Sequence, residues 1–463
     1  MNYYRLITAI SLSLLAATGC KSQSPAVTSS EQVPQGEEQA NSAESAAEPT
    51  VPKDYVDIAD WCRPGMTEPI SAQEWAKANN AFGLKYLAHT KGNTVFSPYS
   101  IERALGMTLD GACATTASEM LAALALPNAM RLSISGRDVD DAMKAVNENT
   151  MLEIENSLWP DISLTLPDDY LARISAGYRN KTIKLDYRAD PEKARQIIND
   201  DVAKTTHDRI KDLLPKDGIT SGTSLVLTNA VYFKSKWLEP FDIDDTKNEK
   251  FYNSDKEIYT QTMHAFGMED KHVCLAEDYA IFDMEFDSAK EGEKGAYVMR
   301  IVLPTIDDKH PMEKRMELLE NVEKQLSADF TSGCENNYFD KVHIAMPKFK
   351  SQPESISIKD KLESMGMIKA FDNDAEFYAM PNTTPQPAAP SQYLHIDDVY
   401  HKAFIEIDEK GGEAAAATAV VMVPVVDLEQ VTAYYFKVDH PFIYMIMEKS
   451  TGAAIFMGRV TDL

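Results

Sequence analysis

The most distinctive segment of this chain runs from Glu409 to Val426, and the chemistry it offers is that of its backbone. Gly411 and Gly412 give this segment the conformational freedom of a hinge. Because side chains alternate between faces along a strand, one face would carry only small or apolar residues: Gly412, Ala414, Ala416, Thr418 and Val420. The charge of Glu413 would fall on the opposite face with Ala415 and Ala417, where it stays in water. The pattern predicts an exposed loop that is able to enter an existing sheet as a new strand.

A second interpretation of the same segment is a short helix, because alanine has the highest helix propensity. The paired glycines before the alanine run disfavour a helix, and the β-branched residues after it favour a strand. We therefore prefer the inserting loop.

No pattern typical of a catalytic or cofactor site occurs elsewhere in the chain. The sequence contains no HExxH, no GxSxG and no glycine-rich phosphate loop, so we predict neither an enzyme nor a bound cofactor. Four cysteines follow Cys20, and they show no CxxC spacing that would indicate a metal site: Cys62, Cys113, Cys274 and Cys334. They allow three disulfide pairings. A chain of this size does not need disulfides for stability, so we expect most of these cysteines to be free or buried.

The charge balance excludes some classes of partner. Among 463 residues, 72 are acidic and 46 are basic, which gives a net charge of -26. Phosphate binding requires clustered Lys and Arg, so neither nucleic acid nor an anionic lipid surface bound through a basic face is predicted. The region around Arg131, Arg137 and Lys144 also contains Asp138, Asp140 and Asp141, and therefore does not indicate a glycosaminoglycan site.

The N-terminus predicts export and a lipid anchor. Arg5 precedes an apolar stretch from Leu6 to Ala17, which is typical of a secretory signal and too short to span a bilayer. The signal ends at Gly19-Cys20, which resembles a bacterial lipoprotein box, so the resemblance implies lipidation of Cys20; ordinary cleavage nearby is the alternative. Lys21 follows in place of the Asp that commonly retains such proteins at the inner membrane, which favours the outer membrane, on its periplasmic or surface face, or the extracellular space.

The rest of the chain divides into a tether and one domain. After a signal at 1–19, residues 20–55 have almost no large apolar side chain and predict a flexible tether, and residues 56–463 predict a single domain. A helix is expected around Trp75 to Leu87, and helical patterns recur to about His207. Strand patterns then follow at 225–233, 298–303, 342–349, 442–447 and 454–457. This order indicates an α+β fold, with a surface loop at the Pro-rich stretch 383–390.

Several of these segments resemble motifs of the serpin family, in the family's order along the chain. They are Asn93–Ile101, Asn156–Trp159, Leu227–Trp237 with Pro240-Phe241, Met346–Lys350, Gly366-Met367, His401–Ala403 and Phe456–Val460. The resemblance covers roughly Trp75 to Leu463 and implies the serpin fold, with about eight or nine helices packed on three β-sheets and an exposed reactive-centre loop. Asp201 and Gly412 depart from the family pattern, in which an aromatic residue and a Thr or Ser are usual.

The resemblance also implies a function, namely suicide inhibition of serine proteases. Counting from Gly411 by the family spacing places the reactive bond at Val425-Val426, after Pro424, with Met422-Val423 as the alternative. A small β-branched residue suits the shallow pocket of elastase-like proteases. The loop hinge would begin at Glu409, and the chain would act as a monomer that contributes no catalytic group.

The resemblance assigns further residues to gating of the sheet. Ser97, Ser100, Asn229 and His401 match the polar shutter beneath the strands that must part, and Trp237 matches the tryptophan at the breach. A non-inhibitory serpin that acts as a binding or carrier module is the alternative function. The small, uniform side chains of the hinge favour the inhibitor.

Overall fold

The predicted first helix is present as α1 (Ala72–Ala88), in a computed structural model that describes residues 70–127, 139–143, 146–178, 180–288, 296–330, 333–351, 356–380, 394–412 and 433–463. Ser71 accepts a hydrogen bond from the Glu74 amide while the Glu74 carboxylate accepts one from the Ser71 amide, which is a capping box. The other α-helices are α2 (Pro98–Leu109), α3 (Ala114–Ala123), α5 (Asp168–Tyr178), α6 (Pro191–Thr205), α7 (Arg315–Gln325) and α8 (Lys359–Ser364).

The larger sheet has nine strands, most of them from the second half of the chain. Its order is β1 (Thr94–Phe96), β17 (Ala454–Val460), β16 (Phe442–Glu448), β8 (Tyr297–Pro304), β7 (Tyr279–Glu285), β6 (Glu257–Leu275), β9 (Glu335–Pro347) and β15 (Ala433–Lys437), with β5 (Lys247–Tyr252) paired to β6. Every side chain of β16 and β17 is buried, which explains the continuous apolar runs that predicted these two strands.

The second sheet has six strands and contains the start of the predicted inserting loop. Its order is β10 (Phe349–Ser351), β13 (Ile405–Asp408), β14 (Gly411–Gly412), β4 (Leu225–Lys236), β2 (Thr150–Pro160) and β3 (Lys181–Thr182). A small third sheet pairs β11 (Ile356–Ser357) with β12 (Tyr400–His401). The predicted α+β class and the three sheets are confirmed.

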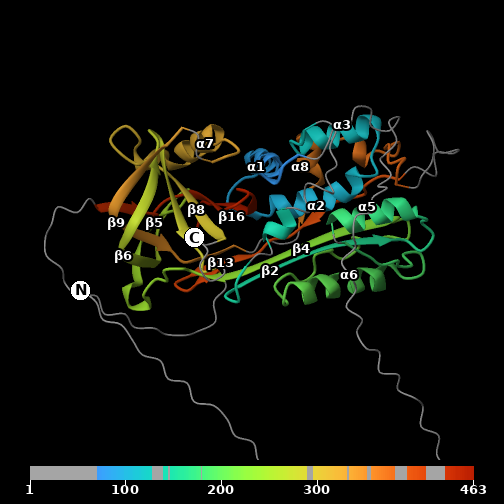
Figure 1. Cartoon of the computed structure of the whole chain (residues 1–463), viewed down its shortest axis with the longest axis horizontal. Helices are drawn as coiled ribbons and strands as arrows, with labels where there is room; N and C mark the ends of the chain where they lie inside the picture. Colours follow the sequence, from blue (N-terminus) through green and yellow to red (C-terminus); the bar gives the residue numbers. More distant parts are fainter. Residues whose placement is uncertain are drawn as a thin grey trace, which may run out of the picture. The chain divides into compact units, whose positions relative to one another are not determined.

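Helix α2 lies where the two large sheets meet. It packs against β17 of the nine-stranded sheet and against β4 of the six-stranded sheet. Figure 1 shows α2 on one side of β4 and β2, with α6 on the other side. The main hydrophobic core therefore includes buried side chains of both sheets together with those of α1 and α2.

The cysteines differ from the expectation. Cys274 and Cys334 form a disulfide, with a Cα–Cα distance of 5.4 Å, because the antiparallel pairing of β6 with β9 brings them together across a sequence separation of 60 residues. Cys113 is buried and is also disulfide-bonded, to a partner outside the described residues. The expectation that most cysteines are free or buried was therefore wrong for Cys274 and Cys334, which are bonded and half-buried, whereas Cys113 is buried as expected although it is not free. Among the described helices, none is long and apolar enough to cross a membrane.

Candidate functional site

The predicted hinge begins inside the six-stranded sheet. Gly411 pairs with Asp408 on β13 and with Lys236 on β4, and Gly412 pairs with Ile407 and Ser235. The two glycines thus form a short strand antiparallel to both neighbours. They are the first residues of the segment whose small side chains predicted insertion into a sheet.

The two glycines are not equivalent in this position. Gly411 has a φ of 143°, and a Cβ on it would lie 2.1 Å from the Ser235 carbonyl oxygen, so only glycine fits this close backbone approach. A Cβ on Gly412 would lie 3.9 Å from ring atoms of Phe233 and Phe286, which is ordinary van der Waals contact. The glycine at the departure from the family pattern is therefore replaceable, and its neighbour is not.

The turn before the glycines is held by polar contacts to three other segments. The Glu409 carboxylate lies 2.5 Å from the Lys348 ammonium and accepts a hydrogen bond of 2.7 Å from the Thr246 hydroxyl. Burial pushes the pKa of the Glu409 carboxyl upward, but the hydrogen bonds from Lys348 and Thr246 outweigh that effect and hold it below its usual value. The Phe241 amide donates to the Glu409 carbonyl at 2.9 Å. This turn is anchored at both its backbone and its side chain.

Trp237 packs beside the same turn. Its indole N–H donates to the Asp408 carbonyl at 2.9 Å, and its backbone amide donates to the Lys410 carbonyl at 2.8 Å. The indole ring stacks on Phe286, with centroids 4.4 Å apart. The residue that the sequence assigned to the breach therefore lies at the end of the sheet where the hinge enters.

Below the hinge, the six-stranded sheet is not closed by a ladder between β4 and β13 in the part of the chain that the structure describes. Gly412 lines a small cavity of about 10 Å³ together with Phe233, Phe404, Ile405, Glu406, Ile446 and Phe456. Two of its lining side chains, Ile446 and Phe456, are apolar and belong to β16 and β17 of the nine-stranded sheet. Small side chains that continued from Gly412 would meet this surface.

The segment after α6 contacts β4 and the residues just before β13. The His207 ring lies 4.8 Å from the Tyr232 ring on β4, and the Arg209 guanidinium lies 5.5 Å over the Phe404 ring, next to β13. The Lys402 ammonium donates to the Lys211 carbonyl at 2.9 Å. These contacts connect the two strands indirectly, through side chains of the segment after α6.

The predicted shutter residues are brought together around the start of α2. The Ser97 amide donates to Nε2 of His401 at 3.1 Å, and the Ser97 hydroxyl caps α2 by accepting from the Ser100 amide at 3.0 Å. Burial lowers the pKa of His401 to about 4, so its imidazole is neutral near pH 7 and Nε2 accepts the hydrogen bond. Asn229 lies on β4 opposite Asn156, but its side chain is outside the described part.

The remaining predicted site residues lie outside the described residues. These are Cys20, the hinge from Glu413 through Thr418, and both possible reactive bonds, Val425-Val426 and Met422-Val423. Their assignments stay predictions.

Sequence reasoning missed a buried charged cluster on α2. Arg103 donates to the Asp140 carboxylate at 3.1 Å and to the Gly177 carbonyl at 2.6 Å. Its neighbour Glu102 is fully buried, and burial raises its pKa to about 7. Adjacent acidic and basic residues on an otherwise apolar helix were the signal that was available.

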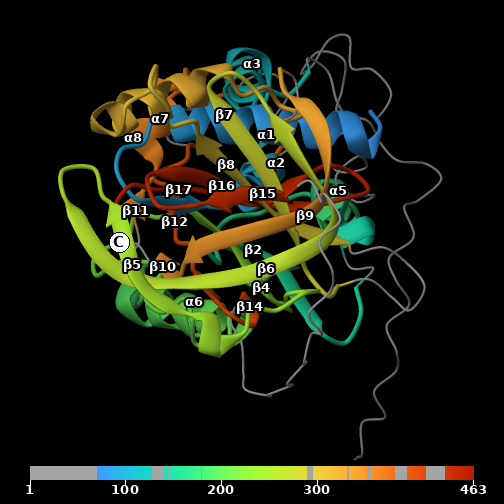
Figure 2. The same cartoon turned by 90° about the vertical axis from the view of Figure 1, so that its left-hand side faces the viewer.

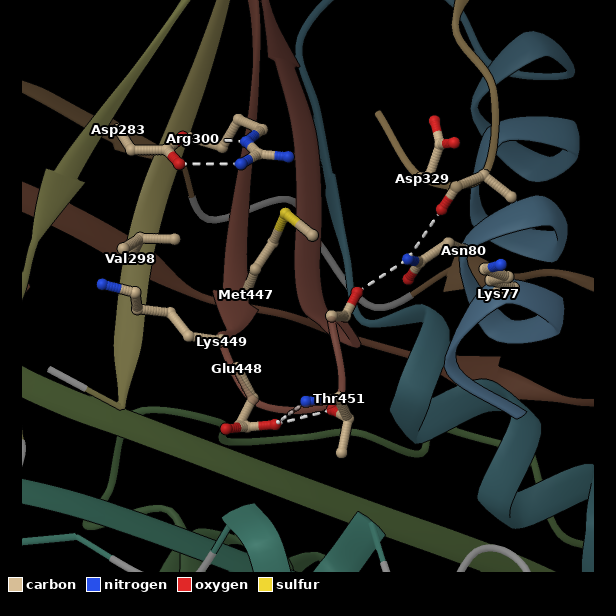
Figure 3. A pocket seen from close by; sticks show the side chains of 12 residues that line it. Lys77, Asn80, Asp283, Val298, Arg300, Asp329, Met447, Glu448, Lys449 and Thr451 are labelled. Atoms are coloured by element: carbon tan, nitrogen blue, oxygen red, sulfur yellow. Dashed lines mark hydrogen bonds and ion pairs between the residues drawn. The ribbon is translucent and has the colours of Figure 1, made fainter. Parts of the chain in front are cut away.

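Sequence reasoning also missed a pocket of about 320 Å³ between α1, β8 and the turn after β16 (Figure 3). Val298 and Met447 give it an apolar wall, and Lys77 and Lys449 line it as cations. Nε and Nη2 of Arg300 donate hydrogen bonds of 2.8 and 2.7 Å to the Asp283 carboxylate. The remaining guanidinium nitrogen of Arg300 points toward the cavity in Figure 3. Within the described residues no cluster suited to a metal ion occurs.

Comparison with known proteins agrees with this geometry. A family model described as Serpin (serine protease inhibitor) matches residues 77–463. An uncharacterized serpin-like protein of Thermococcus kodakarensis is 32% identical over 409 residues, which cover 87% of this chain and 88% of that protein. Human Serpin B3 is 31% identical over 395 residues, covering 80% of this chain and 94% of its own. The crystal structure of Serpin48 from Tenebrio molitor superposes with a TM-score of 0.68 at 25% identity, over 84% of this chain and 98% of that one.

Proposed function

This chain belongs to the serpin family, and from that premise we propose that it inhibits a serine protease by offering its own loop as substrate. The protease serine attacks the Val425 carbonyl carbon, so that an ester forms while the Val425-Val426 amide breaks and the amine of Val426 leaves with a proton. The freed loop then enters the six-stranded sheet between β4 and β13. The attached protease is displaced and distorted before water hydrolyses the ester.

The observation that carries this proposal is the position of β14. Gly411 and Gly412 already hold the place of a central strand, bonded on both sides, above an opening with an apolar floor. The residues that would follow them into the sheet on the same face are Ala414, Ala416 and Thr418, and none of them carries a charge into it. Insertion would therefore extend an arrangement that has already begun.

The proposed target class is elastase-like. Val425 fills a shallow pocket and cannot pair with the buried Asp of a trypsin-like pocket. Incubating the full chain with an elastase-like protease should produce a covalent complex that survives a denaturing gel, and trypsin should give very little. Exchanging Val425→Arg should invert this preference. A released C-terminal fragment that begins at Val423 would move the reactive bond to Met422-Val423.

A second variant tests the trapping step itself. Ala416→Arg would force a charge onto the buried face of the inserted strand, which is costly without a partner. The variant should be cleaved as an ordinary substrate, with little complex. If it traps protease as well as the wild type does, insertion is not the mechanism.

We further propose that the chain acts as a monomer held at the cell envelope by lipid on Cys20. The signal-like stretch up to Gly19 supports export, and Lys21, in place of the Asp that commonly retains such proteins at the inner membrane, favours an outer-membrane or extracellular position. Cys20→Ala should release soluble protein that still inhibits. Continued sedimentation of that variant with membranes would refute the anchor.

The pocket beside α1 supports a second candidate, a binding or carrier function. Its lining carries both cations, Lys77, Arg300 and Lys449, and carboxylates, Asp283, Asp329 and Glu448, beside an apolar wall, which suits a small apolar molecule with charges of both signs. Calorimetry with phenylalanine, which carries both charges and an apolar ring, as the probe, on the wild type and on Arg300→Gln, tests this function. Arginine-dependent binding together with no protease complex would favour the carrier over the inhibitor.

A further inference from the structure

One end of a second disulfide lies at the start of α3. Cys113 directly precedes this helix, is 1% exposed, and is disulfide-bonded to a cysteine outside the described residues. Backbone hydrogen bonds to the segment after α8 hold this position, because the Cys113 amide donates to the Glu376 carbonyl at 2.7 Å and the Ala379 amide donates to the Gly111 carbonyl at 3.2 Å. The Cys113 side chain packs against Tyr378 and Ala379. A chain segment bonded to Cys113 is therefore attached at a fixed point of the domain.

The bonding partner of Cys113 follows from the chemistry of the remaining cysteines. The chain has five cysteines, and Cys274 and Cys334 are bonded to each other. Cys113 is therefore bonded to Cys20 or to Cys62, which both lie outside the described residues. Lipidation, as proposed above, converts the Cys20 thiol into a thioether, which has no thiolate form to enter a disulfide. Cys62 is then the cysteine that remains.

The start of α3 lies away from the place where the reactive loop rejoins the fold. The loop is followed by β15, which pairs with β9. Figure 1 shows β9 and β6 on one side of the domain and α3 and α5 on the other side. Figure 2 looks onto the first of these sides, with β15 beside β9. We call these two parts of the domain the loop end and the α3 end.

We propose that Cys62 is bonded to Cys113, and that this bond fixes the point where the membrane tether leaves the domain at the α3 end. Formation of the bond removes two electrons and two protons from the two thiols. A thiol–disulfide oxidoreductase of the compartment outside the cytosol takes them up, as its own disulfide becomes a dithiol. This inference rests on the proposed lipid anchor at Cys20.

The position of the bond decides which end of the domain faces the membrane. About 40 residues separate Cys20 from Cys62, and a flexible chain of that length has a root-mean-square span of about 35 Å. A compact domain of about 400 residues is about 55 Å across. A tether that leaves at the α3 end therefore holds the loop end farther from the membrane than the α3 end. This arrangement favours capture of a protease that is free in the medium over one that is embedded in the same membrane.

Peptide mapping of the full chain tests the pairing. The chain is denatured without reductant and digested with trypsin, which cuts after Lys and Arg. The peptide of residues 54–63, which contains Cys62, should be joined to the peptide of residues 104–131, which contains Cys113, and reduction should separate them. A bond between 104–131 and the N-terminal peptide that contains Cys20 would overturn the pairing and the anchor together. Free thiols on both Cys62 and Cys113 would overturn the pairing alone.

Energy transfer to the membrane tests the orientation. The lipidated full chain is bound to phosphatidylcholine vesicles with an acceptor dye on some headgroups, and it carries a donor dye on an unnatural side chain at Ile368 or at Tyr435. Ile368 is 53% exposed, and its amide donates to the Glu119 carboxylate on α3 at 2.9 Å, whereas Tyr435 is 56% exposed on β15. Transfer from Ile368 should be at least about twice that from Tyr435, because the distances of the two positions from the membrane differ by a large part of the domain's width.

The double variant Cys62→Ala, Cys113→Ala is the matched control. It keeps Cys20, but its tether leaves the domain at the start of α1, so the ratio of the two transfer efficiencies should fall toward one. Equal transfer from the two positions in the wild type, or an unchanged ratio in the double variant, would overturn the orientation. A chain that does not bind the vesicles would refute the anchor and the orientation together, and the peptide map decides the pairing independently of both.

Discussion

Both large sheets are held by backbone hydrogen bonds between strands, but their central strands differ in length and in the side chains that they bury. In the nine-stranded sheet, β16 is paired along its length with β17 on one side and β8 on the other, and all its side chains are buried. In the six-stranded sheet, the central position between β13 and β4 is held by two glycines. The first arrangement buries large apolar side chains with each ladder pair, and the second buries almost none.

This difference indicates which sheet is able to open. Burial of apolar surface is the main favourable term in folding, at about 25 cal/mol for each Å². Separating β16 from its neighbours would expose Phe, Ile, Tyr and Met side chains, whereas in the described residues β4 and β13 are joined only through the two glycines of β14. A strand can therefore be added to the six-stranded sheet without breaking the core. In the proposed insertion, the nine-stranded sheet would stay fixed behind the six-stranded sheet.

The largest expected effect on the ability of the six-stranded sheet to accept a strand comes from adding a side chain to the hinge. Gly411→Ala would put a Cβ against the backbone of Ser235 and Lys236, where no side-chain movement relieves the clash. The chain could not pass into the sheet at this point, so we expect the loop to be cleaved with at least about a tenfold fall in the fraction trapped as complex. A denaturing gel of the products after reaction with an elastase-like protease measures that fraction.

Gly412→Thr is the matched control for this change. The neighbouring glycine has room for a Cβ, and threonine restores both strand preference and the residue type usual in the family. Trapping should equal or exceed that of the wild type. If the two substitutions behave alike, the conformation of β14 does not control insertion.

A second prediction concerns α2, which touches both sheets. Glu102 is fully buried, faces the Trp75 indole, and lies near Arg103, Asp140 and Asp110. Burial is the main cause of its pKa of about 7, against an ordinary value of 4.5. Because the pKa of Glu102 is higher in the folded than in the unfolded chain, its contribution to the free energy of unfolding is fully present below pH 4.5. About 3 kcal/mol of that free energy is lost as the pH rises from 4.5 to 7.

The titration of His401 changes the free energy of unfolding with pH in the opposite direction. Its pKa falls from 6.5 to about 4 on folding, so stability is lost as pH falls through that window. The two effects oppose each other between pH 4.5 and 6.5. Glu102→Gln removes one of them, so the variant's free energy of unfolding should rise with pH across this window by about 2 kcal/mol more than that of the wild type. Urea unfolding at pH 4.5, 5.5 and 6.5 tests this, and parallel curves for the two proteins would contradict it.

The sequence was sufficient to predict the fold where patterns are regular. The continuous apolar runs at 442–447 and 454–457 are β16 and β17, and the amphipathic stripe from Trp75 to Leu87 is α1. Trp237 lies beside the turn before the hinge and His401 beside the start of α2, and their breach and shutter roles stay predictions. In each case local spacing carries the information, because period and neighbours decide which face is buried.

What the sequence did not reveal depends on contacts between distant segments. The Cys274–Cys334 disulfide requires the register of β6 against β9, and the buried Glu102 requires knowledge of what covers α2. The ring contacts of His343 with Phe266 and with Tyr435 join three strands, and Phe266 lies at a register shift of β6 against β9 that no local pattern announces. Periodicity states which face a residue takes but not which strand lies beside it.

The smallest expected effect comes from two ion pairs, one at each sheet. The Lys348–Glu409 pair at the hinge and the Lys449–Glu285 pair on the nine-stranded sheet both have a 2.5 Å contact, and both lysines are 34% exposed. The carboxylates differ, because Glu409 is 7% exposed and Glu285 is 31% exposed. Only the first pair would leave a carboxylate that water cannot readily reach.

Replacing each lysine by methionine therefore separates burial from pairing. Lys348→Met should lower the free energy of unfolding by about 1–3 kcal/mol, because the charge of Glu409 stays buried without its cation. Lys449→Met should cost less than about 1 kcal/mol, because Glu285 is rehydrated. The pKa of Glu409 is held below its usual value, so the pair stabilises the fold above that range and the contribution is lost as pH falls through the folded pKa. The excess cost of Lys348→Met measured by urea unfolding at pH 7 should accordingly shrink toward pH 4, and Glu409→Gln in the same chain should recover part of it. If the two lysine substitutions lowered the free energy of unfolding equally at pH 7, the Glu409 carboxylate would be as accessible to water as that of Glu285. The ion pair at the hinge would then stabilise the six-stranded sheet no more than the Lys449–Glu285 pair stabilises the nine-stranded sheet.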